Sequence, residues 1–210
     1  MKLTNIKVIA FDCDGVMFDT TKSNMTYYNR ILEHFNMPHM TADQFAYTHM
    51  HTVDASLDYL FKNREIRKKA HEVRKTLNYF SLIRYMEIEP GLKPLLKKLR
   101  PEYKTAIATN RSDTMDRVLA EHDLAGYFDL VISARDVDHP KPFPDPLLKI
   151  MNYFNIFPDN MIYIGDSEVD EQASLAAGIP FVAYNNPSLS ADIHIKSLRE
   201  MESLLIIESL

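Results

Sequence analysis

Two short segments far apart in the chain carry the residue types best suited to chemistry. Asp12 and Asp14 directly follow one apolar run, and Asp166 and Asp170 follow another. In an open α/β sheet, such strand ends face the crevice in which these folds hold their ligands. Two acidic strand ends offer oxygen ligands to Mg²⁺ and leave one carboxylate to act as a nucleophile. These residues therefore predict a phosphoryl-transfer enzyme.

The spacing of the first acidic pair favours a division of roles. Residues two apart in an extended segment project to the same side, so Asp12 and Asp14 face one way and Cys13 the other. One carboxylate can attack phosphorus while the other protonates the leaving oxygen. A solvated acidic loop is the alternative, because Asp and Gly are common at strand ends. Cys13 is expected to be a buried structural cysteine.

The second acidic pair is compatible with a shared cation. Asp166 and Asp170 lie one helical turn apart if a helix begins after Ser167, so both carboxylates can face one ion. Acidic residues in the first turn of a capped helix would give the same pattern. The presence of the first pair favours the metal interpretation.

Two further segments can hold a phosphate group. Thr109, Asn110 and Arg111 follow an apolar run, and a hydroxyl with backbone N–H groups at a strand end can bind phosphate oxygens. A plain turn is the alternative for the first two, and Arg111 suits either an anionic substrate or solvent. Lys141 stands between two prolines, which stiffen its loop and fix the direction of the ammonium group.

The composition restricts the classes of partner. The 210 residues are 46% hydrophobic and 25% charged, as in an ordinary globular protein, and the net charge of −5 disfavours nucleic acid or an anionic membrane as a partner. No apolar run is long enough for a membrane span, and the first residues lack the pattern of a signal peptide. The single cysteine fits a reducing compartment, so we predict a cytoplasmic location. No pattern predicts an oligomeric state.

Short apolar runs alternate with helical patterns over most of the chain. This alternation predicts an α/β fold, a mostly parallel sheet covered by helices on both faces. A helix is expected from an N-cap at Asp145 to about Phe154, another ends at Gly178, and a last amphipathic helix contains Leu198 and Met201. The expected strands are Val8–Phe11, Thr105–Thr109, Leu130–Ser133, Met161–Gly165 and Phe181–Ala183.

Residues 20–85 interrupt this alternation with helix-like segments alone. We therefore predict a core domain of residues 1–19 and 86–210 and a helical cap domain of residues 20–85, with crossings that can act as lid hinges. The pair His49 and His51 diverges on a helix, which disfavours a metal site there. The expected helices of the insert are Asn24–Asn36, Thr41–His49, residues 53–63 and a long basic helix over residues 64–85 with a solvated face.

In order and spacing, the four polar segments resemble the haloacid dehalogenase-like hydrolase superfamily. They span the whole predicted core, and the insert resembles the α-helical cap of the phosphoglycolate phosphatase and β-phosphoglucomutase branch. The resemblance implies a Rossmann-like sheet in which the strands that carry Asp12 and Asp166 share one site. It also implies a Mg²⁺-dependent phosphatase that acts on a small phosphorylated metabolite.

The resemblance assigns roles to the acidic residues by position. Asp12 would be the nucleophile that forms an aspartyl-phosphate, and Asp14 would be the general acid and then the general base. Asp12, the backbone carbonyl of Asp14 and Asp166 would bind Mg²⁺, with Asp170 supporting the ion through its waters. Thr109 and Lys141 would hold the phosphoryl oxygens, aided by the backbone N–H of Asn110.

Two departures bear on the reaction. Val16 stands where many phosphatases of the family have threonine. The mutase branch and some phosphatases carry valine there, so this residue leaves a sugar-phosphate mutase open as the alternative reaction without deciding between the two. Asp14 disfavours dehalogenation and phosphonate cleavage, whose branches lack this acid. A non-catalytic phosphate-binding module is the third hypothesis, and it predicts a damaged catalytic set.

Overall fold

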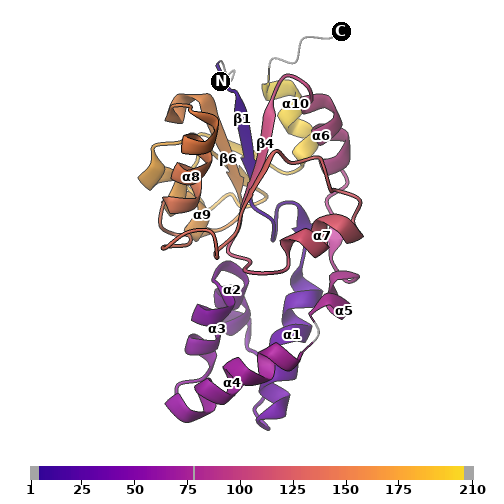
Figure 1. The fold of residues 1–210 in the computed structure, drawn as a ribbon, viewed down its shortest axis with the longest axis vertical. Coiled ribbons are helices and arrows are strands. Elements are labelled where there is room, and N and C mark those ends of the chain that lie inside the picture. Colours follow the sequence, from indigo (N-terminus) through magenta and orange to yellow (C-terminus); the bar gives the residue numbers. More distant parts are fainter. Residues whose placement is uncertain (1–4, 78, 206–210) are drawn as a thin grey trace.

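A parallel β-sheet forms the centre of the molecule. The computed structural model describes residues 5–77 and 79–205, and within them six parallel strands pair in the order β5-β4-β1-β6-β7-β8 (Figure 1). Strand β1 is flanked by β4 and β6, so these three strands end side by side. The strands are β1 (Val8–Phe11), β4 (Lys104–Ala108), β5 (Leu130–Ile132), β6 (Met161–Gly165), β7 (Phe181–Tyr184) and β8 (Ile193–Ile195). The predicted Rossmann-like α/β core is confirmed.

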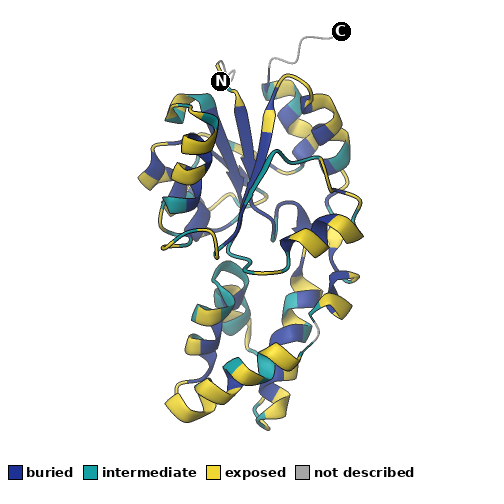
Figure 2. Cartoon of the chain, in the orientation of Figure 1, coloured by how far each residue is buried: buried dark blue, intermediate teal, exposed yellow. Residues whose placement is uncertain are grey.

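Helices cover both faces of this sheet. In β1 the side chains of Ile9 and Phe11 enter one apolar cluster, and those of Val8 and Ala10 enter the other, as the two-residue period of a strand requires. Because both clusters are shielded from water, the central strands β1 and β6 are buried along their length (Figure 2). The outer strands β5 and β8 are only partly buried. One face is covered by α6 (Leu92–Leu99), α7 (Met115–Glu121) and α10 (Met201–Leu204), the other by α8 (Asp145–Phe154) and α9 (Glu168–Ala177).

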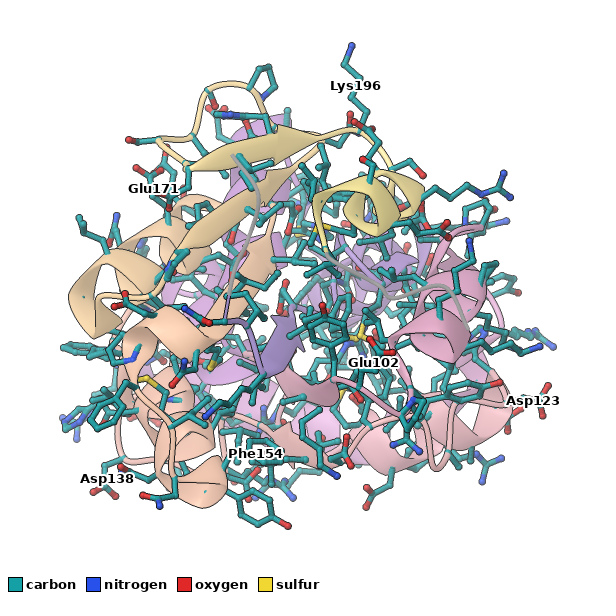
Figure 3. All side chains as sticks on the ribbon, turned by 90° about the horizontal axis from the view of Figure 1, so that it is seen from above. Glu102, Asp123, Asp138, Phe154, Glu171 and Lys196 are labelled. Atoms are coloured by element: carbon teal, nitrogen blue, oxygen red, sulfur yellow. The ribbon has the colours of Figure 1, made fainter. Side chains whose placement is uncertain are left out.

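The view from above shows the same layers around the sheet. The labelled charged side chains Asp123, Asp138 and Lys196 extend outward at the rim, where they are solvated (Figure 3). The apolar residues of the helices face inward instead. The helices are thus amphipathic, with charged side chains toward solvent and apolar side chains toward the core.

Helix ends agree with the sequence prediction in one case and differ in another. Helix α9 ends at Gly178, whose φ of +69° is the left-handed conformation that glycine tolerates. Helix α8 has Pro144, not Asp145, at its N-cap position, and no side chain caps it. Asp145 instead lies 3.1 Å from Nδ1 of His139. The tail forms a 3₁₀ turn, Leu198–Glu200, before the short α10.

The insert packs around an apolar core of its own. Ile31, Leu57 and Phe61 are among the buried residues at its centre. The single long helix predicted over residues 64–85 is wrong, because the chain turns to extended backbone at Leu77, which packs with Tyr79 against this core. The helices are α1 (Thr21–His34), α2 (Ala42–Met50), α3 (Val53–Leu60), α4 (Arg64–Thr76) and α5 (Phe80–Ile83).

A short antiparallel ribbon joins the insert to the sheet domain. Strand β2 (Phe18–Asp19) pairs with β3 (Glu87–Ile88), so the two crossings lie side by side. The backbone N–H of Glu89 also donates to the carbonyl of Met17 at 3.0 Å. The insert hangs below the sheet in Figure 1, facing the ends of β1, β4 and β6. The exact domain boundaries and the lid motion stay predictions.

Candidate active site

A cavity of about 730 Å³ lies between the carboxyl edge of the sheet and the insert. Asp12 follows β1, Thr109 follows β4 and Asp166 follows β6, so strand order alone brings these three side chains to one place. Seven of the eight residues predicted for the site line this cavity, and Asp170 lies directly behind it. The lining members are Asp12, Asp14, Thr109, Asn110, Arg111, Lys141 and Asp166.

Lys141 is the buried cation at the floor of the cavity. Its side chain is 2% exposed, and its Nζ lies 2.7 Å from Oδ1 of Asp12 and 2.5 Å from Oδ1 of Asp170. It also donates to the hydroxyl of Tyr163 at 2.8 Å. Burial opposes the charged ammonium, but the two carboxylates outweigh it and raise the pKa of Lys141 above its usual range. Lys141 therefore stays a cation beside the predicted nucleophile.

Asp170 has both carboxylate oxygens occupied by protein donors. Oδ1 accepts from Lys141 and from the Tyr163 hydroxyl at 2.7 Å, and Oδ2 accepts from the Ser167 N–H at 3.1 Å and the Ser167 hydroxyl at 2.5 Å. Burial alone would raise the pKa of Asp170, yet Lys141 and these hydrogen bonds lower it. The helix-cap alternative is thus realised, since Asp170 and Ser167 form a capping box at the start of α9. The same carboxylate orients Lys141.

Tyr163 belongs to this network and was not predicted from the sequence. It lies in the middle of β6, which reads as a plain apolar strand, and its hydroxyl oxygen also lies 3.1 Å from the carbonyl oxygen of Ala108. The available signal was a tyrosine within an otherwise aliphatic strand, because a buried phenol needs a hydrogen-bond partner.

Three carboxylates offer a site for a hard cation. Oxygens of Asp12, Asp166 and Asp170 lie within 4.8 Å of one another. The pKa of Asp12 is raised to about 7, mainly by burial. The negative charges of Asp170 and Asp14 also raise this pKa, whereas the positive charge of Lys141 lowers it. Burial and the neighbouring carboxylates likewise raise the pKa of Asp166 well above its usual range. A divalent cation would offset this crowded negative charge, and an all-oxygen donor set suits Mg²⁺.

Gly15 provides the space that Asp166 needs. Its φ is +87°, and a Cβ built on it would lie 2.1 Å from Oδ2 of Asp166. Any other residue would therefore displace the Asp166 carboxylate from its position next to the first acidic loop. The glycine in this loop permits both the sharp turn and the approach of the second acidic segment.

Asp14 is held by a bidentate pair with Arg111. Arg111 Nε donates to Oδ2 of Asp14 at 2.6 Å, and Nη2 donates to Oδ1 at 2.7 Å. Burial would raise the pKa of Asp14, but the guanidinium lowers it to about 2. The backbone N–H of Arg111 in turn donates to the Thr109 hydroxyl at 3.1 Å. The two predicted residues Asp14 and Arg111 therefore act on each other in this structure.

Polar side chains of the insert reach the same ion pair. Asn24 donates to Asp14 Oδ1 at 3.3 Å, and the hydroxyl of Tyr79 accepts from Arg111 at 3.0 Å and donates to Asn24 Oδ1 at 2.9 Å. Asn24 also lies 3.3 Å from Nδ1 of His49. None of these three insert residues was predicted for the site, because their approach depends on how the insert packs and not on a local motif.

Asn110 links three parts of the site through its side chain. Its Nδ2 donates to the carbonyl of Met50 in the insert at 3.0 Å and to the carbonyl of Lys141 at 2.9 Å. The amide thereby ties the Lys141 loop to the end of β4 and to α2. This position adds a structural contribution to the predicted role of its backbone N–H.

Other features singled out from the sequence take the simpler interpretation. Cys13 is fully buried in the sheet core. Among residues 5–77 and 79–205, the cluster able to hold a metal consists of the three aspartates, so His49 and His51 are outside it. Within the same residues, no helix has the length and apolar character needed to cross a bilayer.

Comparisons with known proteins agree with this geometry. A phosphoglycolate phosphatase from Chromobacterium violaceum is 29% identical over 220 residues, covering 98% of this chain and 99% of that protein. The structure of a HAD-superfamily hydrolase of subfamily IA, variant 1, from Geobacter sulfurreducens is 36% identical, with a TM-score of 0.78 and coverage of 95% and 96%. A β-phosphoglucomutase from Clostridium difficile is 23% identical, with a TM-score of 0.81 and coverage of 93% of both chains, which shows a shared fold alone.

The family model gives the same result as these relatives. The model for haloacid dehalogenase-like hydrolases matches residues 9–184, which include both acidic segments and the helical insert. The resemblance inferred from the four polar segments is thereby confirmed. This chain belongs to the haloacid dehalogenase-like hydrolases.

Proposed function

We propose that this protein is a Mg²⁺-dependent phosphatase that hydrolyses a small phosphorylated metabolite through an aspartyl-phosphate on Asp12. The observation that carries the proposal is the position of Asp12, at the end of the central strand and on the floor of the cavity, with Lys141 Nζ 2.7 Å away. The phosphoglycolate phosphatase relatives favour phosphoglycolate as the first substrate to test. A cavity of this size suits a small metabolite.

In the first step the phosphoryl group moves to Asp12. Lys141 and the Thr109 hydroxyl bind its oxygens, where they offset the charge that spreads over them in the transition state. A carboxylate oxygen of Asp12 forms a bond to phosphorus as the bond to the ester oxygen breaks. Asp14 is ionised while it is paired with Arg111, so it must take up a proton from solvent once that pair opens. It gives this proton to the departing oxygen, which leaves as an alcohol.

In the second step water releases the phosphate. Asp14, now ionised, removes a proton from a water molecule, and the water oxygen attacks phosphorus. The bond between phosphorus and Asp12 breaks, which restores the free carboxylate and liberates inorganic phosphate. Because Arg111 holds both oxygens of Asp14, this pair must open before Asp14 can reach the departing ester oxygen or the attacking water molecule.

The metal would be held by the same carboxylates. Asp12, Asp166 and the backbone carbonyl of Asp14 are the proposed ligands, with Asp170 supporting the ion through water. When bound, Mg²⁺ supplies positive charge that stabilises the transferring phosphoryl group. Asp170 keeps a second duty in this scheme, since it also fixes Lys141.

The alternative functions receive less support. A mutase needs groups that bind a sugar phosphate and activate one of its hydroxyls, and the likeness to a mutase concerns the fold alone. A non-catalytic module predicts a damaged set, whereas the predicted residues of this chain gather in or beside one cavity. Both alternatives are nevertheless separable by assay.

The proposal is tested by phosphate release from a panel of phosphorylated metabolites, with Mg²⁺ and with chelator. Asp12→Asn is the blank, because it keeps the shape of the side chain but removes the nucleophile. We expect release that needs Mg²⁺ and is abolished in the blank. Release that persists in Asp12→Asn would refute the nucleophile, and isomerisation that depends on a sugar bisphosphate would instead establish the mutase.

A further inference from the structure

The cavity has buried cations at two different depths. Lys141 lies at the floor beside Asp12, and Arg111 lies on the wall beyond Asp14. The Arg111 side chain is 8% exposed, compared with 18% for Arg74 and 60% for Arg135, which line the same cavity. Arg74 and Arg135 pair with acidic residues outside the catalytic set, Asp54 and Asp113. Arg111 is thus the least exposed of these three arginines, and it holds the carboxylate proposed to give a proton to the departing alcohol.

The partner of Arg111 is the residue that must change partners during the reaction. Asp14 occupies the Nε and Nη2 edge of the guanidinium with both of its oxygens. If Asp14 turns to the leaving oxygen, a guanidinium with little access to water loses its counter-ion. Such a loss is costly for a buried charge, so another anion must take this edge for the exchange to proceed at low cost.

The other contacts of Arg111 keep the guanidinium in place during such an exchange. Nη1 donates to the Thr114 hydroxyl at 3.1 Å, and Nη2 donates to the Tyr79 hydroxyl at 3.0 Å. The guanidinium also lies over the Tyr79 ring, 5.3 Å from its centroid. The planar edge now used by a carboxylate therefore stays aimed into the cavity and fits a second carboxylate in the same bidentate geometry.

From this geometry we propose that Arg111 selects phosphate esters whose alcohol portion carries a carboxylate, by binding that carboxylate in place of Asp14. The exchange releases Asp14 to face the leaving oxygen, so recognition of the correct substrate and placement of the proton donor occur together. The proposal rests on the phosphatase function proposed above and adds the substrate class and the residue that reads it. An ester without the second anion leaves Asp14 on Arg111.

A pair of nearly isosteric esters tests this proposal. 2-Phosphoglycolate carries the carboxylate, and 2-hydroxyethyl phosphate has a hydroxymethyl group in its place. For the unmodified protein we expect kcat/KM to favour the carboxylate ester by about 100-fold, because a buried group built for a charged partner rejects an analogue that lacks it. In Arg111→Gln this preference should fall below about fivefold, because phosphoglycolate loses its carboxylate partner and the neutral ester has no such contact to lose.

A control variant distinguishes loss of the contact between Arg111 and the substrate carboxylate from a general effect of lowering the net charge of the protein. Arg30 is exposed on α1 and does not line the cavity, so Arg30→Gln makes the same change in net charge away from the site. Its preference should equal that of the unmodified protein. Equal losses on both esters in Arg111→Gln would mean that Arg111 only maintains structure, and this would overturn the proposal.

Two further results keep the test decisive. Arg111→Lys retains the charge but not the planar fork, and its preference should be intermediate, about tenfold. If Arg111→Gln fails to fold, an unchanged preference in Arg111→Lys overturns the proposal. Absence of Mg²⁺-dependent release from any ester by the unmodified protein would refute the phosphatase function itself, whereas release from both esters without preference would refute the role of Arg111 alone.

Discussion

The sheet domain and the helical insert contribute to the same cavity in different ways. On the sheet side, Lys141 and Asp170 are buried and saturated by protein partners at 2.5 to 3.3 Å. On the insert side, Arg74 pairs with Asp54, whose side chain is largely exposed, and His49 lies 3.3 Å from Asn24. A buried and fully bonded network has a fixed geometry, whereas partly solvated pairs exchange partners readily. We infer that the chemistry belongs to the sheet edge and recognition to its border with the insert.

Removal of the buried cation should produce the largest effect. Lys141→Met leaves Asp12 and Asp170 without their shared partner, so we expect a loss of kcat/KM of about 10³-fold or more. The free energy of unfolding should also fall by about 3 kcal/mol, because two buried carboxylates lose their counter-ion. Steady-state kinetics and thermal melting check both expectations. Lys149→Met, at an exposed position, is the control. Equal losses of kcat/KM and of stability in the two variants would contradict the inference that the chemistry belongs to the sheet edge.

Loss of a proposed metal ligand should rank second. Asp166→Asn keeps the shape of the side chain but weakens an oxygen donor and removes its charge. The Mg²⁺ concentration needed for half-maximal activity should rise by about 100-fold or more. Asp159→Asn, an exposed position before β6, serves as the matched variant. An unchanged Mg²⁺ titration in Asp166→Asn would eliminate this residue as a ligand.

The crowded carboxylates should also appear in the stability of the metal-free protein. The folded pKa of Asp12 is raised from 3.8 to about 7, so the folded state binds this proton more tightly than the unfolded state does. Stability is therefore lost as pH rises from about 4 to about 7. In chelator at pH 8, the free energy of unfolding of Asp12→Asn should exceed that of the unmodified protein by about 2 kcal/mol, and its melting temperature should be about 4 °C higher.

Mg²⁺ provides the internal check on that stability measurement. The ion should stabilise the unmodified protein and reduce the advantage of Asp12→Asn, because it offsets the charge that the substitution removes. A variant that melts below the unmodified protein in chelator at pH 8 would show that the Asp12 carboxylate is not destabilising in the folded state.

The solvated face of the insert should give the smallest effect. Lys68 and Lys69 are exposed on α4, away from the residues that line the cavity. The double replacement Lys68→Gln and Lys69→Gln should change kcat/KM by less than about twofold, since exposed charges contribute little. A loss of tenfold at moderate salt would mean that this face attracts the substrate, and the division between the regions would need revision.

The sheet was predictable because its strands are marked by local composition. The apolar runs at Val8–Phe11 and Met161–Gly165 match β1 and β6, and each ends at its aspartate. Strand β8 was missed because it has three residues with the polar His194 at its centre. The break after α4 was also missed, since the contacts of Leu77 and Tyr79 that cause it are tertiary.

The site residues that lie in local motifs were also predictable, whereas those that depend on tertiary contacts were not. Asp12, Asp14 and Asp166 stand in recognisable segments, and parallel strand order brings their ends together without further information. The Asn24 and Tyr79 contacts depend on the fold of the insert, for which no motif was available. The direct pairing of Asp14 with Arg111 joins residues 97 positions apart, and only the assembled cavity reveals it.

In the proposed reaction, the phosphoryl group passes through a covalent bond to Asp12. The most direct measurement is acid quenching during turnover of phosphoglycolate, followed by borohydride reduction of any acyl phosphate and mass spectrometry of the peptides. We expect Asp12 to be recovered as homoserine, and we expect the signal to be absent in chelator. Reduction at another carboxylate such as Asp14, or none during confirmed turnover, would contradict the proposed reaction.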